Sequence, residues 1–304
     1  MRQHITGIIL TLDEEKNILD AIDSLRWTDH IIVVDSFSSD HTVPLARRSG
    51  AEVVTHEFVN YADQRNTALE LADTEWVFFL DADERVPPPL AGEVLSKLEQ
   101  PQRGWWVPRH NFIFGRLTRS AGWYPDYQMR LLHRESARYD PTRTVHEEVQ
   151  LQGESGYLEN ALIHFNYDDR AEFIRKQEKY TNLEAQTRHR QGQRPRPWTF
   201  LTAPLRHFWW RFITLGGYRD GFHGLNLSML MAYYEFETWR RVARLSETTP
   251  RINKGDLRGR LGMSHLEALA LGLHRHKGAF TAYPGGGPVD GQYITFASHA
   301  VGAR

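Results

Sequence analysis

Two aspartates with one residue between them follow an apolar run at residues 76–80. On an extended chain this spacing places the carboxylates of Asp81 and Asp83 on the same face. Carboxylate oxygens at a strand end suit Mg²⁺ or Mn²⁺ and leave coordination positions for substrate phosphates. The spacing therefore predicts a divalent metal site, with a solvated turn as the alternative interpretation.

Apolar runs and helix-like patterns alternate through the first third of the chain. The β-branched and aromatic runs lie at residues 5–11, 31–35, 51–55 and 76–81. The helix-like patterns lie between them, at residues 15–25, 42–49 and 62–72. This alternation is typical of an α/β fold with a mostly parallel, Rossmann-like sheet, in which ligands bind at the carboxyl ends of the strands. The polar side chains that follow the strands, among them Asp13, Asp35 and Asp81, should therefore meet at one edge of the sheet.

The remainder of the chain divides by composition. Strands are expected at residues 105–114, 128–133 and 157–165, and helices at 170–190, 199–215 and 222–245. The segment Arg194-Pro-Arg-Pro197 should interrupt the chain before the last two helices, which are amphipathic and rich in aromatic residues. We therefore expect a catalytic domain at 1–192, a basic helical region at 193–245 and a loosely ordered tail at 246–304.

Composition excludes several classes of protein. The 304 residues are 40% hydrophobic and 25% charged, which rules out wholesale disorder. The absence of cysteine excludes a disulfide scaffold, a thiolate metal site and a cysteine nucleophile. The N-terminal residues do not read as a signal peptide, and no apolar run is long enough to span a bilayer. We expect a soluble or membrane-surface protein.

Charge is distributed unevenly along the chain, although the net charge is −1. Residues 1–100 carry 8 basic and 19 acidic side chains, whereas residues 185–245 carry 10 arginines and 3 acidic side chains. Of the 36 aromatic residues, 12 lie between Trp198 and Trp239. Basic, aromatic helices suit the interface of an anionic bilayer, with a lid packed on the core as the alternative. The acidic first part of the chain argues against nucleic-acid binding.

Four motifs follow one another in the order found in inverting glycosyltransferases of family 2. They are Thr11-Leu-Asp13-Glu14-Glu15, Val33-Val34-Asp35 with its loop to Asp40 and Thr42, Arg65-Asn66, and Asp81-Ala-Asp83-Glu84. The first motif departs from the family pattern at Asp13, where asparagine is usual. The chain thus resembles this family over about residues 1–245, and the resemblance implies a GT-A fold.

The resemblance also implies where a nucleotide-sugar donor binds. The residues it assigns to the nucleotide are Thr11, Asp13, Glu15, Asp35, Arg65, Asn66 and Asp81. Asp83, with Asp81 beside it, would hold the divalent metal that bridges the donor diphosphate. Helix capping is the alternative role for Thr11 and for Asp40, because both precede helix-like patterns.

Inverting transfer needs a base that takes the proton of the acceptor hydroxyl. Related enzymes carry Val-His-Glu in this part of the chain, matched here within Thr144-Val-His146-Glu147-Glu148. Glu147 is the favoured base, and His146 is the alternative because imidazole titrates near neutral pH. Glu148 lies outside the matched motif, and a plain surface His–Glu pair is the remaining interpretation.

A segment ahead of the proposed base could contact the acceptor or the diphosphate. Its candidate residues are Trp123, Tyr124, Asp126 and Arg130. The guanidinium of Arg130 suits bidentate contact with phosphate oxygens, and the two aromatic rings could stack on sugars. Packing is the equal alternative for each of these residues.

Within the family, the chain looks most like bacterial lipopolysaccharide inner-core β-glucosyltransferases, including at Gly217-Tyr-Arg-Asp-Gly221-Phe-His-Gly224. That resemblance implies UDP-glucose as donor, a lipid-linked saccharide as acceptor and a peripheral position on the cytoplasmic face of the inner membrane. Two other functions are considered. A nucleotidyltransferase would normally carry a glycine-rich loop after the first strand, and residues 11–17 contain no glycine. A non-catalytic membrane-associated binding protein would not need the intact Asp81, Asp83 and Glu147.

Overall fold

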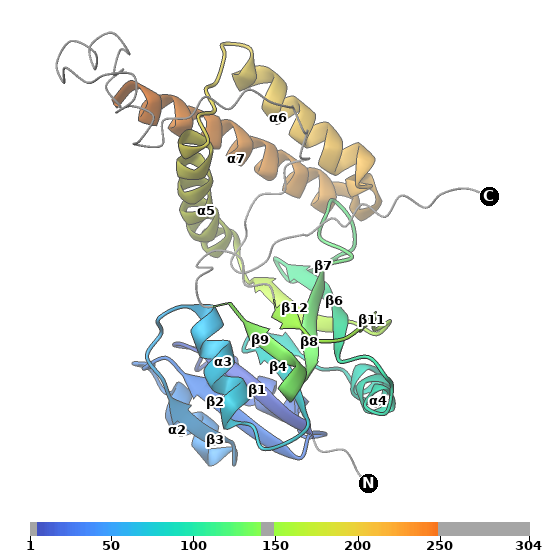
Figure 1. Ribbon diagram of the computed structural model, residues 1–304. Coiled ribbons are helices and arrows are strands. Elements are labelled where there is room, and N and C mark those ends of the chain that lie inside the picture. The colour runs from blue at the N-terminus through green and yellow to red at the C-terminus, as the bar shows by residue number, and fades with distance from the viewer. Residues whose placement is uncertain (1–4, 141–148, 249–304) are drawn as a thin grey trace, which may run out of the picture.

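The computed structural model describes residues 5–140 and 149–248, and its N-terminal part is a parallel sheet (Figure 1). The strands lie in the order β3-β2-β1-β4. Their bounds are β1 Ile5–Thr11, β2 His30–Asp35, β3 Glu52–Thr55 and β4 Trp76–Asp81. The helices between them are α1 Ile18–Ser24, α2 Thr42–Arg48 and α3 Tyr61–Leu71. The four predicted strands are confirmed, and the first helix begins at Ile18 rather than at residue 15.

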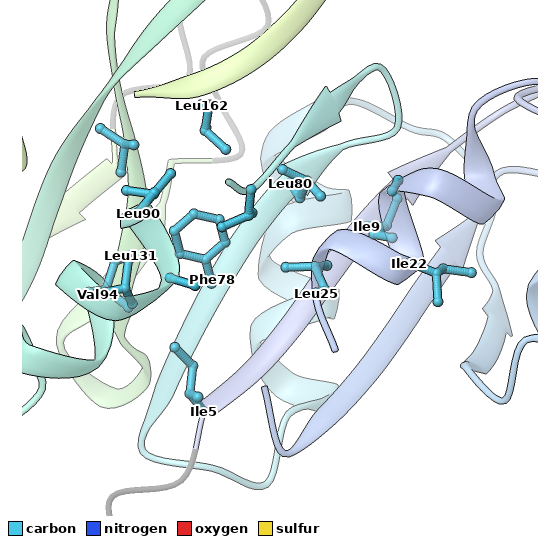
Figure 2. Close-up of a cluster of buried hydrophobic side chains, with 14 of the residues drawn as sticks. Ile5, Ile9, Ile22, Leu25, Phe78, Leu80, Leu90, Val94, Leu131 and Leu162 are labelled. Atoms are coloured by element: carbon cyan, nitrogen blue, oxygen red, sulfur yellow. The ribbon is translucent and has the colours of Figure 1, made fainter. Parts of the chain in front are cut away.

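Both faces of this sheet are covered, which explains why its strands are almost continuously apolar. One face packs against α1, α2 and α4 (Pro88–Lys97), and the other packs against α3 and the β9–β10 pair. Figure 2 shows the first of these clusters, where Phe78 and Leu80 of β4 lie between Ile22 of α1 and Leu90 of α4. Each of these side chains is fully buried and stabilises the fold by roughly 1.5–3 kcal/mol. The core therefore holds the ends of the strands in fixed positions.

The second half of the sheet is mixed, with the full strand order β3-β2-β1-β4-β8-β6-β12-β5. Strand β8 is antiparallel to both β4 and β6, and β12 is parallel to β6. The principal bounds are β5 Glu84–Arg85, β6 Gly104–Ile113, β8 Tyr127–His133 and β12 Leu162–Tyr167. The short elements are β7 Arg116–Thr118, a 3₁₀ turn at Arg134–Ser136, β9 Ala137–Tyr139, β10 Val149–Leu151 and β11 Ser155–Tyr157. The strand predicted at residues 157–165 is thus divided between β11 and β12.

The C-terminal helices form a unit above the sheet in the view of Figure 1. Helix α7 packs against both α5 and α6. The bounds are α5 Arg170–Arg190, α6 Thr199–Trp209, a π turn at Trp210–Thr214, a 3₁₀ turn at Gly217–Asp220, and α7 Gly221–Thr248. Helix α7 runs past the expected boundary at residue 245, and the proposed tail from 249 onward lies outside the described residues. None of the described helices combines the length and the apolar character that a membrane span requires.

The turn between α6 and α7 is hydrogen-bonded to the loop that leads from β7 towards β8. The carboxylate of Asp220 accepts hydrogen bonds from the backbone N–H of Arg119 (3.1 Å) and from the hydroxyl of Ser120 (2.5 Å). The guanidinium of Arg211 donates to the carbonyl of Ala121 over 2.8 Å. The helical unit and the sheet are therefore joined directly at the segment that enters β8.

Two glycines of the motif at residues 217–224 make this turn possible. A Cβ on Gly224 would overlap the carbonyl oxygen of Gly217. A Cβ on Gly217 would lie 2.9 Å from the carbonyl oxygen of Arg211. The glycines are thus required by the close approach of three backbone segments.

Replacing Gly224 with alanine should lower the free energy of unfolding by about 2 kcal/mol or more, because backbone must move to admit the methyl group. Gly92 in α4 is the matched control, since a Cβ there meets nothing within 4 Å. Gly92→Ala should be neutral or stabilise the helix by up to about 1 kcal/mol. Chemical denaturation of both variants measures the difference, and equal effects would show that the turn relaxes freely.

Candidate functional site

Three of the predicted nucleotide-binding positions lie side by side at the carboxyl edge of the parallel sheet. In the strand register Thr11 of β1 is paired with Asp35 of β2, and Leu10 is paired with Asp81 of β4. Neighbouring strands lie about 4.8 Å apart, so one ligand can reach all three strand ends. The predicted meeting of polar residues at this edge is confirmed.

The side chain of Thr11 lies buried at this edge of the sheet. Its hydroxyl oxygen is buried and has no hydrogen-bond partner among the described residues. Helix α1 begins only at Ile18 with Asn17 as its N-cap residue, so Thr11 does not cap it. An unpaired buried hydroxyl costs on the order of 1–3 kcal/mol, which a bound ligand with a donor or acceptor would recover.

The loops after β1 and β2 are joined by side chains of the first two motifs. Both carboxylate oxygens of Asp35 accept hydrogen bonds from Ser38, from its N–H (2.9 Å) and its hydroxyl (2.5 Å). The carboxylate of Asp13 accepts from the N–H of Ser39 over 2.7 Å. The loops therefore form one preorganised rim above the sheet edge.

The same rim continues through the acidic residues at positions 15 and 40. Glu15 accepts hydrogen bonds from the backbone N–H and the ring of His41, over 3.1 and 3.0 Å. These backbone and ring hydrogen bonds lower the pKa of the Glu15 carboxyl. Asp40 accepts from the N–H of Thr42, the first residue of α2, whereas the N-cap position itself is occupied by His41. It also accepts from the N–H of Glu15 over 3.0 Å.

The Arg-Asn pair of α3 has two different environments. The Arg65 guanidinium lies over the rings of Phe79 and Tyr139, and 3.8 Å from the Asp81 carboxylate. The side-chain amide of Asn66 exchanges two hydrogen bonds with the backbone of Tyr139, over 2.8 and 2.9 Å. Arg65 therefore reaches the rim, whereas Asn66 fixes the end of strand β9.

A buried ion network lies directly beneath the rim. Glu84 of β5 is fully buried and accepts hydrogen bonds from Arg130 of β8 (2.6 Å) and Arg109 of β6 (3.2 Å). Arg109 also donates two hydrogen bonds to the buried carboxylate of Asp126, over 2.6 and 3.0 Å. Two guanidiniums and two carboxylates thus neutralise one another inside the sheet. A single buried charge without an opposite partner would be strongly destabilising.

Asp81 connects the network to the rim. Arg130 binds both of its carboxylate oxygens, and the N–H of Asp81 donates to Glu84. Burial alone would raise the pKa of the Asp81 carboxyl, but the charges of Arg130 and Arg65 outweigh burial and hold the pKa well below its usual value. Asp81 is therefore a fixed anion at any physiological pH.

Asp83 faces a histidine that the sequence analysis did not identify. The Nε2 atom of His164 in β12 lies 3.4 Å from the Asp83 carboxylate, and Nδ1 lies 2.6 Å from the side-chain oxygen of Asn111. The amide nitrogen of Asn111 donates to the Trp123 carbonyl over 2.8 Å, so its oxygen is the acceptor for Nδ1. Nε2 is then the nitrogen directed towards Asp83. Burial opposes ionisation of Asp83, but the charge of His164 and its hydrogen bond to Asp83 outweigh burial and lower the pKa of the Asp83 carboxyl.

This donor set fits a divalent cation that shares its coordination with a substrate. A carboxylate oxygen and an imidazole nitrogen are both ordinary ligands for transition metals such as Mn²⁺. Within residues 5–140 and 149–248 no group of three or more histidine, aspartate or glutamate side chains could hold an ion without help. The remaining ligands would have to come from phosphate oxygens and water.

A polar cavity of about 250 Å³ opens beside Asp83. Its walls include Glu14 from the rim, and Glu172, Arg175 and Lys176 from α5. Burial raises the pKa of Glu14, with the negative charge of Asp83 adding to the effect. The cavity mixes both signs of charge next to the metal position, which suits a phosphorylated or polyhydroxyl ligand.

Of the four residues expected at the acceptor or the diphosphate, three are buried and Tyr124 is half-buried. Trp123 is 3% exposed and packs with Tyr167 in an apolar cluster under α5 and α7. Asp126 and Arg130 belong to the buried network. Tyr124 is half-buried beside the ring of His110. Burial favours a packing role for Trp123. Asp126 and Arg130 instead hold their charged partners, Arg109, Asp81 and Glu84, in place.

The proposed base falls outside the described residues. His146, Glu147 and Glu148 lie in the gap between residues 140 and 149. Strands β9 and β10 on either side of the gap pair with each other, with Tyr139 opposite Val149. The Asn66 hydrogen bonds to Tyr139 hold one end of this pair against α3.

Glu84→Gln should lower the free energy of unfolding by about 3–5 kcal/mol, because it removes the charge that two buried guanidiniums require. Glu70→Gln is the matched control, since Glu70 pairs with Arg138 on the surface, where both side chains are more than 60% exposed. That change should cost less than about 1 kcal/mol. Urea denaturation compares the two. A loss for Glu84→Gln as small as for Glu70→Gln would mean that the network contributes no stability.

The chain is similar to known glycosyltransferases. The family model described as glycosyl transferase family 2 matches residues 6–153. The lipopolysaccharide core biosynthesis glycosyltransferase LpsC of Rhizobium meliloti is 30% identical over 83% of this chain and 96% of its own length. An uncharacterized glycosyltransferase of Rickettsia felis is 26% identical over 81% of this chain and 90% of its own.

Among solved structures, glucosyl-3-phosphoglycerate synthase from Mycobacterium tuberculosis, in complex with Mn²⁺, UDP-glucose and glycerol 3-phosphate, is 24% identical with a TM-score of 0.33. That match covers 44% of this chain and 57% of the other. The extent of the likeness to LpsC, together with the motifs at the sheet edge, settles the family: the chain belongs to glycosyl transferase family 2.

Proposed function

We propose that the protein is an inverting, metal-dependent glycosyltransferase that moves glucose from UDP-glucose to a lipid-linked saccharide of the lipopolysaccharide core. The observation that carries this proposal is the row of Thr11, Asp35 and Asp81 at one sheet edge, with the Asp83–His164 pair beside it. The name of the Rhizobium relative supports the core saccharide as acceptor.

The nucleotide binds across the rim. The carboxylate of Asp35 can accept from the imide N–H of uracil, and the unpaired hydroxyl of Thr11 can bond to the nucleoside. Arg65 of α3 lies at one side of the site for the base. Asp81 accepts hydrogen bonds from the ribose hydroxyls, and Arg130 holds the Asp81 carboxylate in place. Asp13 and Glu15 shape the rim through the loop after β2, and Asn66 supports it from α3.

Asp83 and His164 would hold a divalent cation, Mg²⁺ or Mn²⁺, beside the site proposed for the donor diphosphate. When bound, such a cation would neutralise the negative charge that develops on the departing diphosphate. Arg175 and Lys176 of α5 line the same cavity and add positive charge near the phosphates. His164 is oriented by Asn111, so the pair is ready before the substrate arrives.

Glu147 acts as the base, with His146 as the alternative. The donor cavity lies close to the membrane-bound acceptor because the protein associates peripherally with the cytoplasmic face of the inner membrane. The basic, aromatic region at residues 193–245 supports this location.

The metal site can be tested by binding alone. Asp83→Ala and His164→Ala should each weaken the Mn²⁺-dependent part of UDP binding by about 10–100-fold while leaving metal-free binding almost unchanged. Calorimetric titration of UDP with and without Mn²⁺ measures this. His30→Ala, at the opposite end of strand β2, is the control and should behave as the wild type. Retention of the full Mn²⁺ effect in both variants would place the metal elsewhere.

The reaction and its base are tested with UDP-glucose and a core oligosaccharide freed of its lipid. Wild-type protein should transfer glucose from UDP-glucose and not mannose from GDP-mannose. Glu147→Gln should lower kcat by on the order of 10² or more with UDP affinity unchanged, because it keeps the shape of the side chain and removes its basicity. A larger kcat loss in His146→Ala would assign the base to His146, and absence of transfer by the wild type would overturn the proposed acceptor.

A further inference from the structure

Helix α6 has an apolar outer face that no described element covers. Trp198, Leu201, Leu205 and Trp209 are 58%, 64%, 58% and 62% exposed. Their spacing of three and four residues places them on one side of the helix. Surface helices normally carry polar residues on that side, so a continuous apolar row marks an interaction surface. We call these four residues the α6 stripe.

The stripe is distinct from the face that holds α6 in the fold. Ala203 is buried, and Phe200 contacts Phe236 of α7. Trp210 is half-buried between His207 and Arg211. Helix α6 is therefore apolar on two sides, and only one of them is used to pack on α7. In Figure 1 the helix lies at the outer side of the helical unit, with α7 between it and the sheet.

The segment of the chain that contains the stripe carries charge of one sign in its sequence. Residues 190–219 contain six arginines and no acidic residue. Arg194, Arg196, Arg206 and Arg219 are exposed, and none of these four forms an ion pair within the described part of the chain. Exposed indole and leucine side chains among unpaired arginines match an anionic bilayer interface, where rings enter the headgroup layer and guanidiniums meet phosphates.

We propose that the α6 stripe is the surface by which this protein rests on an anionic phospholipid bilayer, with the four arginines contacting lipid phosphates. The inference deepens the proposed function, because a lipid-linked acceptor is presented at such a surface. The turn that follows α6 holds the loop entering β8, so the docked helix is attached to the site through Asp220 and Arg211. A second copy of the chain is disfavoured as the occupant, since its stripe would bring the same positive charge.

The experiment is co-sedimentation of the full chain with vesicles of phosphatidylglycerol and phosphatidylethanolamine, and with vesicles of phosphatidylcholine alone. The test variant is the triple change Leu201→Ser, Leu205→Ser and Trp209→Ser. Leu95→Ser in α4 and Leu183→Ser in α5 are matched controls, because both side chains are exposed apolar residues outside the stripe (46% and 48%). Thermal unfolding should be nearly unchanged in all variants, since the side chains contribute little to the core.

We expect the wild type and both controls to bind the anionic vesicles, and the triple variant to bind at least about tenfold more weakly. Raising the salt concentration should reduce wild-type binding only in part, because screening weakens the arginine contacts and not the apolar burial. Binding to phosphatidylcholine alone should be weaker than binding to the anionic vesicles.

Absence of wild-type binding at low salt would overturn the proposal, as would equal losses in the triple variant and the controls. A dimer that the triple variant dissociates, in light scattering without lipid, would instead assign the stripe to contact between copies. Glucose transfer to the lipid-free oligosaccharide tests the proposed function separately from the proposed bilayer surface. The triple variant should retain that activity, whereas failure of the wild type to transfer would overturn the proposed function and leave the vesicle result standing.

Discussion

The interaction on which the site depends is the buried pairing of Glu84 with Arg109 and Arg130. These three side chains come from strands β5, β6 and β8, and each is at most 2% exposed. Removing such charges from water costs several kcal/mol per ion, and here the pairing of each charge with an opposite one offsets that cost. With Asp81 and Asp126 the set contains more carboxylates than guanidiniums, and Arg65 supplies further positive charge at the rim. The network therefore holds the parallel and the mixed halves of the sheet in one register.

This arrangement gives the two aspartates of the Asp-Ala-Asp motif different properties. Asp81 is bound on both oxygens by Arg130, so its charge is already compensated by the protein. Among the described residues, the Asp83 carboxylate has an ion-pair contact with His164, at 3.4 Å, rather than a bidentate contact with an arginine. A divalent cation gains more from the less compensated carboxylate. The geometry therefore favours Asp83 as the metal ligand. Asp81, whose charge Arg130 already compensates, is better suited to accept hydrogen bonds from hydroxyl groups.

The sequence predicted the parts of the site that depend on local pattern. The runs ending at Thr11, Asp35 and Asp81 become adjacent strands because near-continuous apolar strands separated by helices must form a parallel sheet. His164 could not be found in this way, since its importance arises from Asn111 and Asp83, which are distant in the chain. One signal was present: His164 and Asn166 are polar residues two apart in a strand that is otherwise apolar, which indicates a buried polar contact. The direction of β8 was also not predictable, because an apolar run fits a parallel or an antiparallel neighbour equally well.

In the helical unit, the glycine motif at residues 217–224 has a clear structural role. The segment from Gly217 to Gly224 is needed because three backbone segments cross where a Cβ would not fit. At that crossing Arg211 is buried without a carboxylate partner among the described residues, and burial lowers its pKa to about 10. It remains charged at neutral pH because the carbonyl of Ala121 and the rings of Trp123 and Trp210 replace the lost water. A buried cation satisfied in this way is sensitive to small shifts of its partners, and two of them, Ala121 and Trp123, lie in the loop that enters β8. The turn between α6 and α7 and the Asp126 carboxylate of the ion network are therefore linked through this loop.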